Sequence, residues 1–392
     1  MKDEIFILKE RKSVYFLQIA EIILFVGILT FFMVKTAPKV LHKAMNDYES
    51  AEFAGWSNEL PQLQAHFKEN LALKNDLTDL ASASDVAFAR IFTDNYNYLK
   101  DTNGIVYHLR NDITEPEWLD DIVRIQAYVD ENQFDTKLVY VQNPLRIDTA
   151  VQYRPHEFTN VDEYKERAKN ILDAGGVDIL NIEGQPDTYF ITDMHATTDG
   201  QVDAMRQIVE YLENQKGIQF RHKDLLDVQN PDLYEKNSYR FIGGYCRSIG
   251  GYYTQKDTFN LYLPLYPTDF VIDFKNTGAQ ITGSFTDALV RIPEEYDSYS
   301  YWITNMAYYG QSVYSIKNTT MEGEPKVLFV MDSAPMTGIC YLSTICSEVC
   351  VYDPRFSGDF PDREWLKEHI GDYDVVLFDA LENSMDYENI FD

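Results

Sequence analysis

The order of apolar and polar positions along the chain first indicates a long apolar segment near the N-terminus. Residues 14–34 read VYFLQIAEIILFVGILTFFMV, and about 20 helical residues suffice to cross the hydrocarbon layer of a membrane. The two polar residues of this segment, Gln18 and Glu21, lie in its first half, where they can stay near the interface. The residues that follow do not form a small-residue cleavage site, so we predict an uncleaved signal anchor, a transmembrane helix over residues 14–34.

The orientation of this anchor follows from what lies on either side of it. Basic residues flank both ends, so the positive-inside bias is slight. The large folded part of the chain comes after the anchor. We therefore expect a single-pass protein of the cell membrane, with a short cytoplasmic tail at residues 1–13 and the bulk of the chain extracytoplasmic.

Beyond the anchor, the chain begins to alternate between helical and extended patterns. Residues 35–130 are expected to form a juxtamembrane and helical N-terminal part, with a turn at 100–104. In residues 131–217, two helices are predicted, the first closed by a glycine C-cap and the second opened by an acidic N-cap. The predicted strands here are 137–142, 177–182 and 188–192, and the predicted helices are 161–176 and 199–217. This alternation predicts the first part of an α/β domain.

Residues 218–320 interrupt this order, and residues 321–392 resume it. In the first of these segments Tyr, Gly, Thr and Phe dominate, and the alternating runs 258–264 and 270–274 predict antiparallel strands in a β-rich insertion. The second segment predicts strands at 326–331, 349–353 and 374–379, with helices near 336–347 and 362–370. Right-handed crossovers between such units produce a parallel sheet covered by helices on both faces.

Composition narrows the classes of function. The 392 residues carry a formal net charge of −29, with 45% hydrophobic residues, so the chain is globular and has no basic surface for nucleic acid. An oxidising exterior would allow one or two disulfides among the four cysteines. Cys340 and Cys346 fall in a predicted apolar helix and are expected to be small buried residues. The cysteine spacing matches no metal site, and no cofactor is expected.

Residues that directly follow strands are the first candidates for chemistry, because ligands bind beyond the carboxyl ends of parallel strands. Asp193 and His195 follow the run 188–192, and Asp332 and Ser333 follow the run 326–331. A serine between a strand and a helix can act as a nucleophile, with His195 as its base and Asp193 as the group that orients the base. Each half alone is commonplace, since an Asp-x-His pair is more often a capping aspartate beside a surface histidine.

Four segments in order resemble the DHHW family, which is similar to the bacterial SGNH-like proteins that O-acetylate alginate. The segments are TDMHAT at 192–197, RFIGGYCRSIGGYYTQKDTFNLYLP at 240–264, Asp332-Ser333, and Asp353-Pro354-Arg355. The resemblance spans roughly residues 60–380. It implies an SGNH-like three-layer α/β/α fold in circularly permuted order, with the serine segment last.

The resemblance also implies roles. Ser333 would be the nucleophile, His195 the general base, Asp193 its orienter and Arg355 a substrate-binding residue, with backbone N–H groups near Ser333 and Ala334 as oxyanion donors. The implied activity is that of an extracytoplasmic O-acyltransferase or acetylesterase that acts on a cell-envelope or exported polysaccharide through a seryl ester. The implied partners are a membrane-bound O-acyltransferase and the polysaccharide, besides the lipid bilayer that residues 14–34 would contact.

Two alternatives to a working serine site stay open, and departures from the family pattern motivate the first of them. Met194 and Ala196 replace a histidine and a tryptophan, Met331 stands where many SGNH enzymes have glycine, and Pro335 follows close behind the serine. A glycine at position 331 would leave the turn before Ser333 open, and a tryptophan at position 196 would pack against the histidine loop. One alternative is therefore a catalytically decayed protein that binds polysaccharide or scaffolds the acyltransferase. The other is a divalent metal held by Asp193, His195 and Asp332.

Overall fold

The computed structural model describes the part of the chain that carries the predicted site. The described residues are 98–100, 104–108, 118–144, 146, 161–184, 186–250, 254–290, 308, 310–356 and 362–380, all within a compact unit that spans residues 82–392. The predicted anchor at 14–34 lies outside the described residues. In the described ranges, no helix has the length and hydropathy needed to cross a bilayer.

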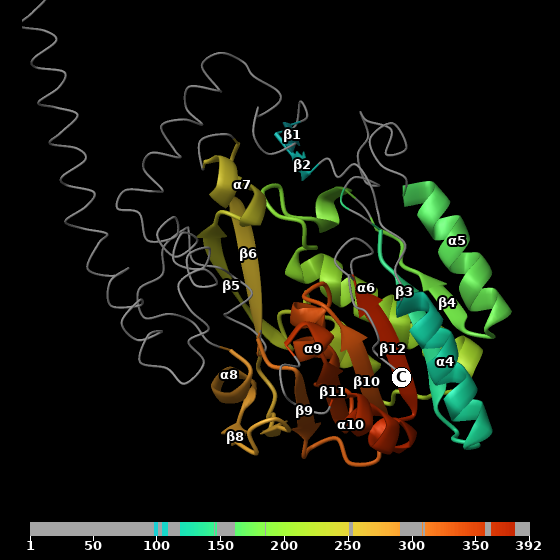
Figure 1. The fold of residues 1–392 in the computed structure, drawn as a ribbon. Coiled ribbons are helices and arrows are strands. Elements are labelled where there is room, and N and C mark those ends of the chain that lie inside the picture. The colour runs from blue at the N-terminus through green and yellow to red at the C-terminus, as the bar shows by residue number, and fades with distance from the viewer. Residues whose placement is uncertain are drawn as a thin grey trace, which may run out of the picture. The chain divides into compact units, whose positions relative to one another are not determined.

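An eight-stranded sheet in the order β4-β3-β12-β10-β11-β9-β7-β8 forms the centre of this unit (Figure 1). Five strands pair in parallel: β4 (Asp178–Asn181), β3 (Lys137–Gln142), β12 (Val375–Ala380), β10 (Lys326–Met331) and β11 (Glu348–Tyr352). Three continue the sheet with antiparallel pairing: β9 (Val313–Asn318), β7 (Phe270–Phe274) and β8 (Gln280–Gly283). The strands predicted at 137–142 and 326–331 are confirmed to the residue.

Helices cover both faces of the sheet, which confirms the three-layer α/β/α arrangement. On one face, α6 (Thr198–Tyr211) and α9 (Met336–Leu342) share a core with Phe329 and Leu377. On the other face, α4 (Trp118–Glu131), α5 (Val161–Ala174) and α10 (Asp362–His369) share a core with Val330 and Phe378. Neighbouring residues of one strand enter different cores, so the parallel strands read as continuous apolar runs.

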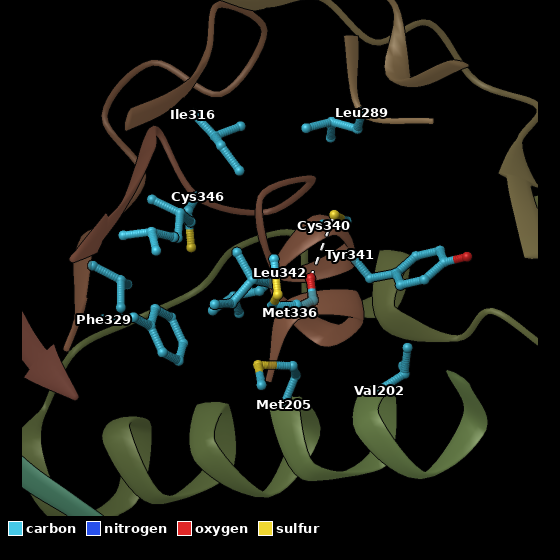
Figure 2. Packing of buried hydrophobic residues seen from close by; sticks show 14 of the residues in the cluster. Val202, Met205, Leu289, Ile316, Phe329, Met336, Cys340, Tyr341, Leu342 and Cys346 are labelled. Atoms are coloured by element: carbon cyan, nitrogen blue, oxygen red, sulfur yellow. Dashed lines mark hydrogen bonds between the residues drawn. The ribbon is translucent and has the colours of Figure 1, made fainter. Parts of the chain in front are cut away.

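The contact between α6 and α9 matters because α9 follows Ser333. Figure 2 shows Met205 of α6 pointing toward Met336 and Leu342 of α9. A Cβ on Gly338 would lie 3.0 Å from the backbone oxygen of Gln201 and 3.0 Å from the Met205 side chain. The missing side chain at Gly338 therefore lets the two helices approach closely, and this fixes the start of α9 against α6.

The segment predicted as β-rich contributes to two different sheets. The antiparallel strands predicted at 258–264 and 270–274 are present as β6 (Asp257–Pro264) and β7. Among the strands that the structure describes, β6 pairs only with β5 (Tyr234–Phe241) in a two-stranded sheet, whereas β7, β8 and β9 extend the central sheet.

Three local predictions were wrong. The segment 188–192 is a loop with a single bridge between Tyr189 and Ala196, not a strand. Helix α6 is capped by Thr197, whose side chain accepts from the Gly200 N–H, and not by Asp199; the last turn of the predicted helix, Leu212–Lys216, is π-helical. Within the N-terminal part predicted as helical, β1 (Tyr98–Lys100) and β2 (Val106–His108) form an antiparallel pair.

The four cysteines are all buried and free. The disulfides that an oxidising exterior would allow are therefore not formed. Cys340 and Cys346 lie in the core shared with α6, as predicted for small buried residues (Figure 2). Burial raises the pKa of Cys346, and it raises the pKa of Cys350 to about 12, so these thiols stay protonated and unreactive.

Candidate active site

The fold brings Asp193, His195 and Ser333 into one hydrogen-bonded chain. His195 Nε2 lies 2.9 Å from Ser333 Oγ, and His195 Nδ1 lies 2.5 Å from Asp193 Oδ1. All three side chains are buried, with exposed fractions of 8% or less. With its Nδ1–H donated to the carboxylate, the ring presents a lone pair on Nε2 to the serine hydroxyl. This is the geometry in which a histidine takes the proton of an attacking serine.

Asp193 is held in its charged form. Burial by itself raises the pKa of this carboxyl group, but the electrostatic interaction and hydrogen bond with His195, together with two backbone N–H groups, bring the pKa below its usual value. The Gly244 N–H donates to Oδ2 at 2.5 Å, and the His195 N–H donates to Oδ1 at 3.0 Å. A negative Asp193 fixes the tautomer and the orientation of the imidazole.

The chain segment around Gly243 leaves room for this carboxylate. Gly243 directly precedes helix α7 (Gly244–Ile249). A Cβ on Gly243 would lie 2.4 Å from Asp193 Cβ and 2.6 Å from the backbone oxygen of Thr192, so no other residue fits without movement. The glycine pair in the segment 240–264 thus has a physical role, since it lets the backbone close on Asp193.

Asp257, which the sequence analysis missed, holds the same loop from the other side. The N–H groups of Ile191 and Thr192 donate to its two carboxylate oxygens, each at 2.7 Å, and the Thr192 hydroxyl donates as well. The same hydroxyl accepts from the Gly243 N–H at 2.7 Å. These N–H groups bond to a side chain instead of a neighbouring strand, which explains why residues 188–192 form a loop. The signal was the aspartate at the start of the run 257–264.

Gln201 joins the histidine loop to the first turn of α9, the helix that follows Ser333. Its Nε2 donates to the Ala196 backbone oxygen at 3.0 Å, and its Oε1 accepts from the N–H groups of Thr337 and Gly338 at 2.9 and 3.0 Å. The side chain is buried. The available signal in the sequence was a polar residue on the inner face of an amphipathic helix.

The serine segment is a short connection between β10 and α9. β10 ends at Met331, and α9 begins at Met336, directly after Pro335. The Met331 side chain is buried in the core shared with α6. The Ala334 N–H donates to Asp332 Oδ1 at 2.7 Å. The oxyanion donor predicted at Ala334 is therefore already engaged, and the donor at Ser333 stays a prediction.

A cavity of about 40 Å³ has one triad residue, His195, in its wall. Its walls include His195, Ala196, Gln201, Ala334, Asn143 and Asp379. About three water molecules fit in such a volume, at 10–15 Å³ each. Met194 also lines it and packs with a third core cluster that includes Tyr245. The residues that replace the family's histidine and tryptophan thus form part of the cavity wall.

Arg355 lies outside the walls described for this cavity. Its guanidinium pairs with Asp353, with Nε 2.9 Å from Oδ1 and Nη2 2.6 Å from Oδ2. Its predicted contact with substrate stays a prediction. Within the described part of the chain, no group of three or more His, Cys, Asp or Glu residues is placed to hold a metal ion, so the alternative of a metal at Asp193, His195 and Asp332 has no structural support.

Comparison with known proteins supports the fold. No family model and no curated protein match the sequence. A DHHW family protein from Eubacterium siraeum superposes with a TM-score of 0.55 at 15% identity, over 76% of this chain and 95% of that one. Bacillus cereus PatB1 superposes with a TM-score of 0.54 at 13% identity, over 76% and 99% of the two chains. A structure of PatB1 with a sulfonyl adduct gives 0.55 over the same shares. The expected resemblance to the DHHW proteins is confirmed as a likeness of fold.

Proposed function

We propose that this protein is a membrane-anchored, extracytoplasmic serine O-acyltransferase or acetylesterase that acts on a cell-envelope or exported polysaccharide. The observation that carries the proposal is the buried chain from Ser333 through His195 to Asp193, with distances of 2.9 and 2.5 Å. The expected anchor at 14–34 and the likeness of fold to the DHHW protein support the setting. A membrane-bound O-acyltransferase is the proposed partner, as the source of acyl groups.

The geometry supports a two-step mechanism. Ser333 Oγ attacks the carbonyl carbon of the acyl donor while His195 Nε2 takes the hydroxyl proton. When the donor oxygen leaves, it receives that proton, and the acyl group remains as an ester on Ser333. A sugar hydroxyl or water then loses its proton to His195 and attacks the ester, and His195 passes that proton to Ser333 Oγ as the ester bond breaks. Asp193 stays charged throughout and stabilises the imidazolium.

The cavity that His195 lines can hold a small acyl group. A space of about 40 Å³ has room for the three heavy atoms of an acetyl group. The walls combine apolar side chains such as Met194 and Met205 with polar ones such as Gln201. A mainly apolar cavity with a few polar groups is suited to bind and orient an ester.

One observation favours the second candidate, a decayed protein that binds polysaccharide or scaffolds the acyltransferase. Ala334, the expected oxyanion donor, gives its N–H to Asp332. A site that has lost this donor would stabilise the tetrahedral intermediate less, and removal of a single donor typically slows the reaction by roughly 10²–10³. Proper fold and binding would remain.

Hydrolysis of a chromogenic acetyl ester by the purified full-length chain in detergent tests the proposal. We expect turnover in the wild type and its loss, by roughly 10³-fold or more, in Ser333→Ala and His195→Ala. Ser238→Ala, which changes an exposed serine on β5, is the control and keeps the wild-type rate. A sulfonyl fluoride should label Ser333 in the wild type and not in His195→Ala, as read by mass spectrometry of peptides.

The same assay separates an active serine site from a decayed one, and adding an acceptor separates a transferase from an esterase. If wild type and variants hydrolyse the ester equally and Ser333 takes no sulfonyl label, the serine is not activated and the proposal is wrong. Acetylated oligosaccharide that forms only with wild-type protein and an added acceptor would identify a transferase. Acetate release without an acceptor would identify an esterase.

A further inference from the structure

Asp379 is a buried carboxyl group beside the candidate triad that the mechanism above does not use. It lies in β12, paired in register with Met331 of β10 on one side and with Val141 of β3 on the other. Only 2% of its surface is exposed, and it lines the cavity together with His195 and Ala334. It therefore lies at the same edge of the sheet as Ser333 and against the cavity that His195 lines.

The surroundings of Asp379 favour its neutral form. Burial, and secondarily the negative charge of Asp332, raise its pKa to about 7, although a hydrogen bond from Asn143 acts in the opposite direction. The Asn143 Nδ2 donates to Asp379 Oδ1 at 2.5 Å. This contact fixes one carboxyl oxygen as an acceptor. In the neutral acid the other oxygen carries the proton and can act as a donor.

The candidate site needs such a donor. In the tetrahedral intermediate, negative charge develops on the acyl oxygen, and donors aimed at it are a large part of serine catalysis. The Ala334 N–H, which would ordinarily contribute, is bound to Asp332 at 2.7 Å. A carboxylic acid kept neutral by its site can donate a hydrogen bond at this position.

We propose that Asp379 is a further catalytic residue, which is held by Asn143 and donates a hydrogen bond from its neutral carboxyl group to the acyl oxygen while Ser333 attacks. The inference rests on the proposed serine mechanism. No proton is transferred to the substrate from Asp379, so the balance of the two steps above is unchanged.

The charged and titratable groups around Asp379 determine how the rate depends on pH. Asp332 faces it from the end of β10, and around the cavity lie His195 from the loop, Glu183 from the chain after β4 and Asp203 from α6. Of these carboxyl groups, Asp332 opposes ionisation of Asp379. Above a pH of about 7, an ionised Asp379 can no longer donate and repels the oxyanion. The rate should therefore fall as the pH rises through this range.

The test compares Asp379→Asn with Asp379→Ala in the full-length chain, with kcat and KM for the chromogenic acetyl ester measured from pH 5.5 to 9. Asparagine keeps a donor that does not ionise, so its kcat should stay within about fivefold of wild type at pH 6 and should lose the alkaline fall. Alanine should lower kcat by roughly 10²–10³ with little change in KM. Asp120→Asn alters an exposed carboxyl group on α4 that does not line the cavity, and it should keep the wild-type pH profile.

Each outcome bears on the inference alone or on the proposed function as well. If Ser333→Ala removes turnover while both Asp379 variants retain wild-type kcat and pH profile, Asp379 is only structural and the inference alone fails. Equal losses in folded Asp379→Asn and Asp379→Ala would indicate a charged base and also overturn it. Turnover retained in Ser333→Ala overturns the proposed mechanism. If the alanine variant does not fold, the pH profile of Asp379→Asn decides.

Discussion

The two halves of the candidate triad are held in place by different means. Ser333 comes two residues after the end of β10, a strand paired on both sides with β11 and β12 and buried between two layers of helices. His195 and Asp193 lie in a loop with one bridge and no place in the sheet. This loop is held by a few backbone hydrogen bonds, such as those from the N–H groups of Val106 and Tyr245, and by the side chains of Asp257 and Gln201.

This difference predicts where the site is vulnerable. The position of the serine depends on many small contributions from strand pairing and core packing, so no single polar contact controls it. The position of the histidine depends on a few buried hydrogen bonds. Since a misplacement of about 1 Å can cost roughly 10²-fold in rate, changes far from the serine should still remove activity if they release the histidine loop.

The largest effect should come from Gly243→Ala. The added Cβ would lie 2.4 Å from Asp193 Cβ, so either the loop or helix α7 must move. We expect a fall of about 10² or more in kcat/KM and a loss of about 1–3 kcal/mol in the free energy of unfolding. Ester hydrolysis and chemical denaturation measure the two effects.

Gly244→Ala is the matched control for this substitution. Its Cβ would meet Asp193 Oδ2 at 3.3 Å, and its N–H stays available to that carboxylate. We expect a change of less than about tenfold in kcat/KM. Equal and small effects of the two substitutions would show that the loop tolerates movement and that the contrast between the two halves is wrong.

A smaller effect is expected from Asp257→Asn. The amide has one acceptor oxygen and an NH2 group, so a donor would face the N–H of Ile191 or Thr192, which both donate to the carboxylate in the wild type. A buried donor left without its acceptor costs about 1–3 kcal/mol. Thermal unfolding should show this loss, and kcat/KM should fall about tenfold or more.

The pH dependence of this loss has a defined sign. Burial raises the pKa of Asp257 above its usual value, even though the bonds from Thr192 and Ile191 act against this. Because its pKa is higher in the folded protein than in the unfolded chain, Asp257 contributes stability to the fold at low pH, fully so below its unfolded pKa of about 4. This contribution is lost as the pH rises through the pKa that Asp257 has in the folded protein. The difference in unfolding free energy between wild type and Asp257→Asn should therefore shrink as pH increases. A difference that grows with pH would contradict this assignment.

The smallest of the three effects is expected from Gln201→Leu. Leucine has nearly the same volume, but it offers no partner to the Ala196 oxygen or to the N–H groups of Thr337 and Gly338. We expect kcat/KM to fall about tenfold, with KM changed less than kcat, because the loop and the serine segment lose their shared tie. Gln126→Leu on the exposed face of α4 is the control and should have no effect. Wild-type kinetics in Gln201→Leu would show that the two halves are positioned independently.

The sequence predicted the sheet more accurately than the loop that carries the histidine. The runs 137–142 and 326–331 became strands without a change of boundary. A strand buried on both faces needs continuous apolar residues, and such a run is visible in the sequence itself. The run 188–192 has the same apolar and β-branched character but became a loop. The N–H groups of Ile191 and Thr192 donate to the Asp257 carboxylate, 65 residues or more away along the chain, and not to a neighbouring strand.

The sequence alone determined the residue types that the site contains and the order of the elements that carry them. Local periodicity, turn residues and an aspartate two positions before a histidine are properties of short segments, so they can be read from the chain itself. Tertiary structure decided that His195 meets Ser333 across 138 residues, that Asp332 takes the Ala334 N–H, and that Asp379 and Gln201 face the cavity. Hydrogen bonds between buried groups depend on distances of a few tenths of an ångström, and only the packed core fixes those distances.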